Sequence, residues 1–120
     1  MNKRIFLLLL SACMAMSMMA QRTPNPMRRT DAAFFKTAEA RKVGDQILLY
    51  QRVTGGWPKN IDMARTLSDS EKAQLAKDRM RRDDSTTDND ATSMQMAYLA
   101  RLFEATHDNR YRDAFRKAVD

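Results

Sequence analysis

Beyond about residue 30, apolar residues recur along this chain at intervals of three to five, which is the period of an amphipathic helix. Three segments carry the pattern, near residues 31–53, 88–105 and 108–120, and a further helix is expected near 69–81, where Ala73, Leu75 and Ala76 supply only a thin apolar contact. We find no segment with the strict alternation of apolar and polar residues that is typical of a half-buried strand. The sequence therefore predicts an all-α fold built from helical hairpins.

Two polar segments separate the predicted helices. Residues 54–60 read Thr-Gly-Gly-Trp-Pro-Lys-Asn, and paired glycines followed by proline predict a loop. Residues 79–87 combine a dense charge cluster with Ser-Thr-Thr, which predicts a second loop. Between them, Ser68 and Glu71 have the spacing of a capping box at a helix start. The last helical pattern reaches the chain end without a stop signal, so we expect the domain of residues 31–120 to be truncated.

Residues 1–20 have the pattern of a cleavable secretory signal. Lys3 and Arg4 precede an apolar run, and a stretch rich in small residues then ends at Ala20. The apolar run is too short to span a membrane, which takes about 20 residues. We therefore expect no transmembrane segment and an exported protein, periplasmic or extracellular. Residues 21–30, which are polar with two prolines, predict a linker.

Cys13 leaves a second interpretation of the signal open. Residues 10–13 read Leu-Ser-Ala-Cys and resemble a lipobox, in which the cysteine is lipidated and becomes the first residue of a lipoprotein. The residues after Cys13 stay apolar, which favours ordinary cleavage. Cys13 is also the only cysteine, so we predict neither a disulfide nor a thiolate metal site after cleavage.

The charge of the chain is only mildly basic. Removing residues 1–20 would lower the formal net charge from +6 to +4. We see no patch of interleaved aromatic and basic residues of the kind that stacks bases, and we predict no nucleic-acid partner. A mild positive balance suits an acidic polysaccharide. We expect the protein to be a monomer.

The first candidate site is the loop that follows Gln51. Glycines tolerate the positive φ found where a helix stops, and Gln51 could bind the freed backbone groups. Two roles remain open for Trp57, which could cover the helix end or face a cleft and stack on a sugar ring. Lys59 and Asn60 could bind a uronate carboxylate or a hydroxyl.

The second candidate site is the oxygen-rich segment 83–92. Calcium takes six to eight oxygen ligands, and Asp88 and Asp90 could contribute carboxylates, although the spacing is not that of an EF-hand. The alternative is simple helix capping by Thr87 or Asp88. His107, the only histidine, lies in a predicted turn without a partner, and we assign it no catalytic role.

Three motifs in order resemble the family 10 pectate lyases. They are Gly-Gly-Trp-Pro-Lys-Asn at residues 55–60, Thr-Asp-Asn-Asp-Ala-Thr at 87–92 and Ala-Thr-His-Asp-Asn-Arg-Tyr at 105–111. The resemblance covers residues 34–120. It implies a mainly helical domain that resembles an α/α toroid and is incomplete at the C-terminus of this chain.

The resemblance also implies an activity and a set of residues. These lyases cleave de-esterified polygalacturonate by β-elimination with Ca²⁺ as cofactor and an arginine as base. Lys59 and Asn60, with Trp57, would line the substrate cleft, and Asp88, with Asp90 as a second candidate, would bind calcium. The catalytic arginine is expected beyond residue 120. The catalytic residue is therefore unknown here, and the fragment alone should be inactive.

The sequence departs from the family motif at two positions, and two other functional interpretations remain open. Thr87 replaces an isoleucine of the family motif, and Asp90 replaces a glycine and adds a carboxylate. One alternative is a non-catalytic secreted helical module that binds carbohydrate or sits on a surface. The other is a different α/α-toroid enzyme such as a terpene cyclase, which export disfavours because the lipid substrates of such enzymes are intracellular.

Overall fold

The computed structural model describes residues 25–120, so the predicted signal peptide and Cys13 lie outside the described residues. The described part contains helices and no strand, which confirms the all-α prediction. None of these helices is both long and apolar enough to cross a membrane. The elements, in order, are η1 (Pro26–Arg28), α2 (Ala32–Phe35), α3 (Ala38–Tyr50), α4 (Asp69–Asp78), η2 (Asp88–Asp90), α5 (Ser93–Thr106) and α6 (Asn109–Val119).

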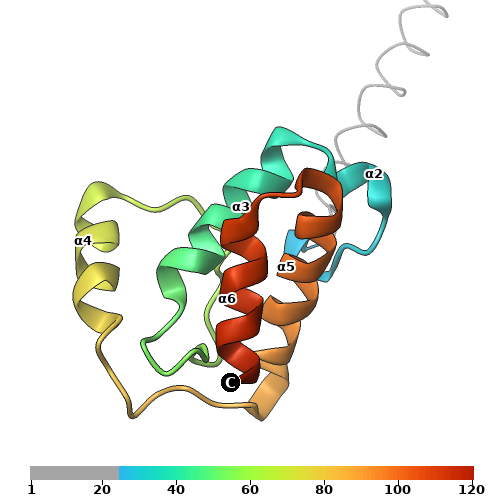
Figure 1. The fold of residues 1–120 in the computed structure, drawn as a ribbon. Coiled ribbons are helices and arrows are strands. Elements are labelled where there is room, and N and C mark those ends of the chain that lie inside the picture. The colour runs from blue at the N-terminus through green and yellow to red at the C-terminus, as the bar shows by residue number, and fades with distance from the viewer. Residues whose placement is uncertain (1–24) are drawn as a thin grey trace, which may run out of the picture.

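Helix α3 is the centre of the arrangement (Figure 1). Helices α5 and α6 form a hairpin that packs on one side of α3, and α4 packs on the other side. The hairpin turns at His107, whose φ of 54° closes α5 in a left-handed cap. The prediction of helical hairpins is therefore confirmed. The wider α/α toroid stays a prediction.

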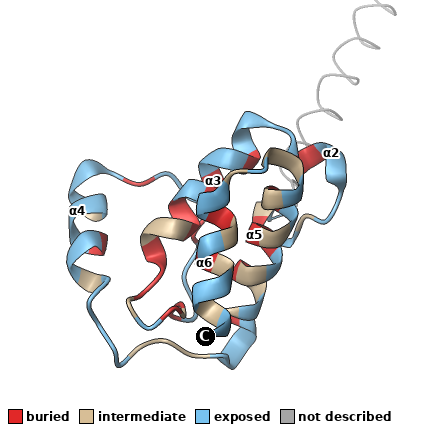
Figure 2. Ribbon diagram, in the orientation of Figure 1, coloured by how far each residue is buried: buried red, intermediate tan, exposed pale blue. Residues whose placement is uncertain are grey.

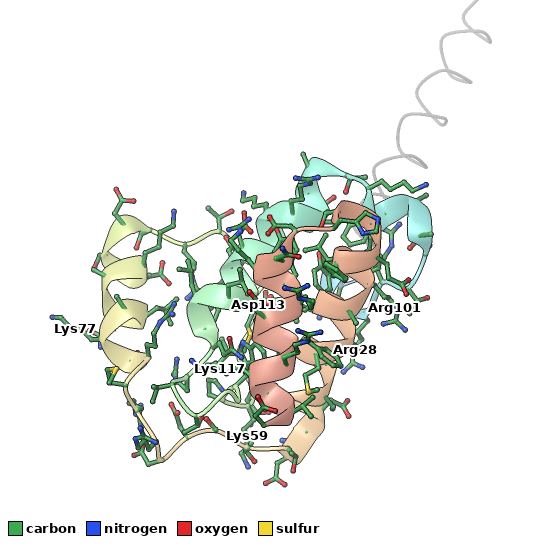
Figure 3. All side chains as sticks on the ribbon, in the orientation of Figure 1. Arg28, Lys59, Lys77, Arg101, Asp113 and Lys117 are labelled. Atoms are coloured by element: carbon green, nitrogen blue, oxygen red, sulfur yellow. The ribbon has the colours of Figure 1, made fainter. Side chains whose placement is uncertain are left out.

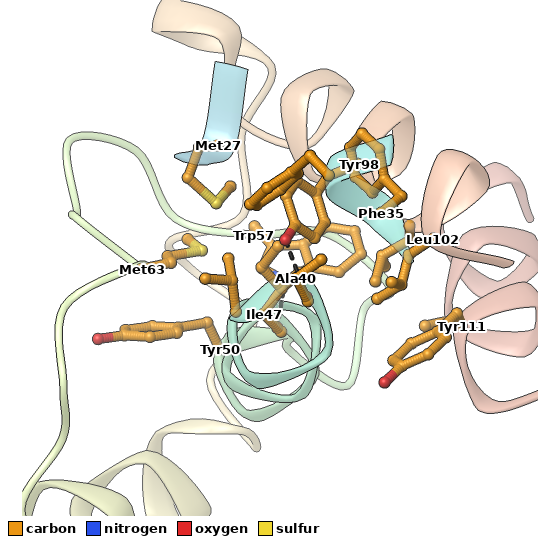
Figure 4. Packing of buried hydrophobic residues seen from close by; sticks show 14 of the residues in the cluster. Met27, Phe35, Ala40, Ile47, Tyr50, Trp57, Met63, Tyr98, Leu102 and Tyr111 are labelled. Carbon is orange, nitrogen blue, oxygen red and sulfur yellow. Dashed lines mark hydrogen bonds between the residues drawn. The ribbon is translucent and has the colours of Figure 1, made fainter. Parts of the chain in front are cut away.

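The core lies where α2, α3 and α5 meet the loop after α3 (Figure 4). The rings of Phe35 and Tyr98 contact edge to face, with centroids 5.0 Å apart. The hydroxyl of Tyr98 donates a hydrogen bond of 2.8 Å to the carbonyl oxygen of Ala40. Burial raises the pKa of Tyr98 well above its usual range. Figure 2 shows the buried residues on the inner faces of α3 and α5, whereas α4 is mostly exposed.

The prediction of one continuous helix over residues 31–53 is wrong, because this segment forms two helices, α2 and α3. The side chain of Thr37 accepts a hydrogen bond from the backbone nitrogen of Ala40 and donates one to the carbonyl oxygen of Phe34. A threonine hydroxyl can compete with helical backbone bonds in this way, and here it ends one helix and caps the next. Helix α3 ends at Tyr50, three residues before the end predicted for the continuous helix at Val53.

The predicted start of the fourth helix near Asp88 is also wrong. Regular helix begins only at Ser93, because Asn89, Asp90 and Thr92 have φ values of 51°, 63° and 65°. Residues with positive φ cannot continue a right-handed helix. Capping by Thr87 or Asp88 is not found either, since neither side chain accepts a backbone hydrogen bond at this helix start.

The part of the predicted linker that the structure describes packs on the helices. Met27 is only 6% exposed, and η1 contacts both α3 and α5. Asn25 caps η1 through a bond of 3.0 Å to the nitrogen of Met27. Just beyond it, hydrogen bonds from the Arg29 guanidinium lower the pKa of Asp31 to about 2. The burial of Met27 and the packing of η1 place residues 25–28 beside the site described below.

Gly44 permits the close approach of the hairpin to α3. A Cβ at this position would lie 2.2 Å from Cδ2 of Leu102 and 3.3 Å from Cε1 of Tyr111. Both neighbours are buried, so neither side chain has solvent to move into. A glycine inside a helix lowers stability by up to about 1 kcal/mol relative to alanine. The close packing of Leu102 and Tyr111 on Gly44 offsets this loss.

We predict that Gly44→Ala lowers the free energy of unfolding by about 1–3 kcal/mol, because overpacking outweighs the gain in helix propensity. Chemical denaturation followed by circular dichroism measures it. In a double-mutant cycle, Leu102→Ala should cost less in the Gly44→Ala background than alone, because the two side chains compete for one space. Additive losses would contradict this explanation.

Candidate functional site

The loop after α3 is fixed to the end of the helical hairpin. Nε2 of Gln51 donates hydrogen bonds of 2.9 Å to the carbonyl oxygens of Gly55 and Ala114. The bond to Gly55 confirms the predicted role of Gln51 in binding backbone groups where the helix stops, whereas the bond to Ala114 on α6 was not predicted. Gly55 has a φ of 93°, and a Cβ there would lie 2.2 Å from the carbonyl oxygen of Lys117. Only glycine fits this approach without strain.

Trp57 covers the helix end and does not face a cleft. Its side chain is completely buried, and its Nε1 donates a hydrogen bond of 2.8 Å to the carbonyl oxygen of Ile47. Such a partner is what a buried indole requires. The ring presents no face on which a sugar could stack, so the structure places Trp57 in the core beneath the other candidate residues.

The hydroxyl of Thr92 is one of the groups that join the two candidate loops. Oγ1 of Thr92 accepts a hydrogen bond of 3.0 Å from the nitrogen of Trp57 and donates one of 2.8 Å to the carbonyl oxygen of Thr86. The nitrogen of Thr86 in turn donates to the carbonyl oxygen of Trp57 at 3.1 Å. Two bonds therefore join Trp57 to residues 86–92, the third closes that segment on itself, and the Lys59 side chain reaches the second loop.

Arg52 and Asp84 form a second link between these loops, and sequence analysis missed it. The Arg52 side chain is only 4% exposed and donates to both carboxylate oxygens of Asp84 at 3.0–3.2 Å. Its Nη1 donates to the carbonyl oxygen of Tyr50 at 3.1 Å. Forked pairing of this kind fixes orientation as well as distance. No sequence pattern indicates that a lone arginine will be buried opposite a particular aspartate.

Three of the predicted site residues meet across the loops. Nζ of Lys59 lies 3.2 Å from Oδ2 of Asp88. Beside this pair, Nδ2 of Asn89 donates a hydrogen bond of 3.1 Å to Oδ1 of Asn60. The Lys59 and Asp88 side chains are 44% and 70% exposed, so both can reach a ligand from solution. Asp90 points elsewhere, and its carboxylate lies 3.7 Å from the guanidinium of Arg28.

Backbone conformations with positive φ gather at this point. Asn60, Asn89, Asp90 and Thr92 have φ values of 51–65°. Such conformations cost of order 1–3 kcal/mol each for residues other than glycine, and they concentrate at functional sites. Asn and Asp tolerate the left-handed region better than most residues. Asp90 stands at the position of the glycine in the motif that the sequence resembles.

A pocket of about 300 Å³ lies against these residues, walled by segments 25–28, 58–62 and 89–95. Figure 3 shows where Arg28 and Lys59 project from the ribbon. Gln95 also lines the pocket, although it is only 4% exposed. Its Oε1 has no hydrogen-bond partner, and its Nε2 has only the sulfur of Met63, at 3.5 Å. The pocket is therefore bordered by charged, amide and apolar groups.

The donor set of the described residues does not fit a complete calcium site. Within residues 25–120, no group of three Asp, Glu, His or Cys side chains could hold a metal ion. Calcium takes six to eight oxygens, whereas Asp88 offers a single carboxylate that Lys59 already contacts. A divalent cation at Asp88 would have to displace that ammonium group.

Comparison with known proteins identifies the family. A family model described as pectic acid lyase matches residues 51–120. The chain belongs to the pectic acid lyase family. Neither the curated proteins nor the solved structures contain a match to it.

Part of the site of this pectic acid lyase family member lies within the matched residues, and part lies before them. Lys59, Asn60 and Asp88 lie within the matched residues, whereas the pocket wall at 25–28 precedes them. Sequence analysis missed the residues of that wall as well as Gln95. Gln95 did carry a signal, because it interrupts an apolar stripe at helical spacing between Ala91 and Tyr98. A polar residue on a buried helix face requires a partner or a function.

We predict that Asp90→Gly raises the free energy of unfolding by about 0.5–1 kcal/mol, because glycine adopts the φ of 63° without strain. The exposed pair with Arg28 contributes too little to reverse this effect. Asp90→Ala is the matched control, since it also removes the carboxylate but keeps a Cβ, and it should be destabilising. Equal stabilities of the two variants, measured by urea denaturation, would contradict the role of strain.

We predict that Arg52→Met lowers the free energy of unfolding by about 2–4 kcal/mol, because it leaves the partly buried Asp84 carboxylate without its main partner. Arg81→Met is the control, because Arg81 lies 3.6 Å from the same carboxylate but is 51% exposed. The control should cost less than about 1 kcal/mol. Thermal unfolding at low and high salt measures both variants, and comparable losses would refute the prediction.

Proposed function

We propose that the protein acts as a pectate lyase of the family 10 type, which cleaves polygalacturonate by β-elimination. The observation that carries this proposal is the meeting of Lys59 with Asp88 and of Asn60 with Asn89. These four residues lie within the region that matches the pectic acid lyase model. They join two of the three motifs on which the resemblance to family 10 rests.

The chemistry of β-elimination gives Lys59 a role. A base removes the proton at C5 of a uronate, and the electron pair of that bond forms a double bond between C4 and C5. The bond from C4 to the bridging oxygen breaks, and this oxygen leaves with the bonding pair and takes up a proton to become a hydroxyl. Negative charge develops beside the carboxylate as the proton leaves. An ammonium group placed at that carboxylate stabilises the charge, which is the purpose of fixed cations in such sites. The amides of Asn60 and Asn89 can bind sugar hydroxyls.

Calcium, export and the rest of the domain belong to the same proposal. Calcium would supply further charge neutralisation at the uronate carboxylate, with Asp88 as one candidate ligand and Asp90 as the weaker second candidate. Because the described residues do not form a complete cage, we assign calcium no contact geometry. We also propose that the protein is exported as a monomer, with the helices forming part of an α/α toroid and an arginine outside this sequence as base.

The test is a lyase assay on the protein produced from its complete open reading frame. Ultraviolet absorbance reports the unsaturated product from polygalacturonate, with calcium and then with a chelator. We expect absorbance to rise with calcium and to stop with chelator. We expect Lys59→Met to lower kcat/KM about 100-fold, a typical loss for one charge-stabilising group.

Lys77→Met is the matched control, because Lys77 lies on α4, far from Arg28 and Lys59 in Figure 3, and is exposed. It should keep full activity. A folded protein that produces no unsaturated product would exclude the lyase proposal. Retained binding of oligogalacturonate in that protein would instead favour a carbohydrate-binding module.

A further inference from the structure

The pocket beside Lys59 has a second cation from a different part of the chain. Arg28 lines it from η1, and Lys59 lines it from the loop after α3. Asp62 also lines the pocket, and its Oδ1 is occupied by the nitrogen of Ala64 at 3.0 Å. The charged side chains of the lining sum to +1, and each of its two cations has a carboxylate partner outside the lining, Asp90 for Arg28 and Asp88 for Lys59. A sugar carboxylate would therefore bind by replacing these exposed partners.

The uncharged part of the lining suits a sugar. Four carboxamide side chains line the pocket, and each amide can both donate and accept a hydrogen bond, as pairs of ring hydroxyls require. Apolar side chains complete the walls, and a volume of about 300 Å³ is at the small end of ligand sites. The amides are those of Asn25, Asn60, Asn89 and Gln95, and the apolar groups include Met27 and Met94.

Gln95 supplies independent evidence that a ligand donor belongs here. Among the described residues, its Oε1 is the sole buried side-chain oxygen or nitrogen without a hydrogen-bond partner. Leaving a buried acceptor unpaired costs about 1–3 kcal/mol. The weak contact from Nε2 to the sulfur of Met63 does little to offset that cost. Because Gln95 lines the pocket, a hydroxyl bound there is the candidate partner for this oxygen.

Arg28 is available to bind such a ligand. Its contact with Asp90 is 3.7 Å long, and the two side chains are 65% and 66% exposed. Exposed pairs of this kind contribute little and exchange readily. A planar guanidinium can instead form two parallel hydrogen bonds with a carboxylate, which also sets its orientation. Met27, buried on the core, anchors the segment that carries Arg28.

We propose that segment 25–28, which precedes the family match, completes a binding pocket for one uronate unit. Arg28 is its specificity-determining residue and binds the sugar carboxylate together with Lys59, while Gln95 accepts a hydrogen bond from a ring hydroxyl. The identity of the sugar as galacturonate rests on the proposed function. The pocket thus distinguishes an acidic sugar from its neutral counterpart through a residue outside the matched domain.

The test compares methyl galacturonoside with methyl galactoside, titrated into the complete protein and followed by ¹H–¹⁵N nuclear magnetic resonance. Neither ligand carries a sugar at O4 that elimination could release, so binding is measured apart from catalysis. We expect tighter binding of the galacturonoside, with a shift of the Gln95 side-chain amide. Arg28→Gln should weaken galacturonoside binding about ten-fold and leave galactoside binding unchanged. Lys77→Gln, the matched control, should change neither.

Several outcomes would overturn the inference. They are an unchanged galacturonoside affinity in Arg28→Gln, an equal loss for both ligands, an undisturbed Gln95 amide, or no galacturonoside binding at all. The result is separable from the lyase assay. A protein that binds the galacturonoside through Arg28 but forms no unsaturated product keeps this inference and loses the proposed activity. An active lyase whose galacturonoside binding is unchanged in Arg28→Gln keeps the proposed activity and loses this inference.

Discussion

The arrangement of the site depends on one threonine hydroxyl. Thr92 needs both to accept from Trp57 and to donate to Thr86, and a hydroxyl is the smallest side-chain group that does both. These bonds also hold Thr92 at a φ of 65°, which costs free energy in a β-branched residue. The two favourable hydrogen bonds therefore offset the cost of the backbone conformation at Thr92, and they fix the second loop against the anchored loop after α3.

Residues 51–60 include both buried side chains that hold the loop in place and exposed polar side chains at the candidate site. Gln51, Arg52 and Trp57 are buried and satisfy their polar groups within the fold. Lys59 and Asn60, only a few residues later, are exposed and meet groups of the second loop. A flexible lysine gains a defined position because the backbone before it is anchored in the core. This division explains why the aromatic residue of the motif contributes structure while Lys59 and Asn60 stay exposed.

Local features could be predicted from the sequence, and long-range pairings could not. Helical periodicity, the capping box of Ser68 and the role of Gln51 all depend on residues near one another in the chain, and the structure confirms them. The break at Thr37 was missed because a threonine within a periodic pattern is usually tolerated in a helix. The partnership of Arg52 with Asp84 spans 32 residues, and periodicity carries no information about which distant charges will meet.

Helix α4 stands apart from this network. Leu75 is its one buried residue, and its own capping box with an ion pair from Arg65 to Glu71 supplies much of its local order. None of its residues lines the pocket beside Lys59. Elements with so little buried surface open at a free energy far below that of global unfolding. The amide protons of α4 are therefore expected to exchange with solvent long before those of α3, through local opening that leaves the remaining helices folded.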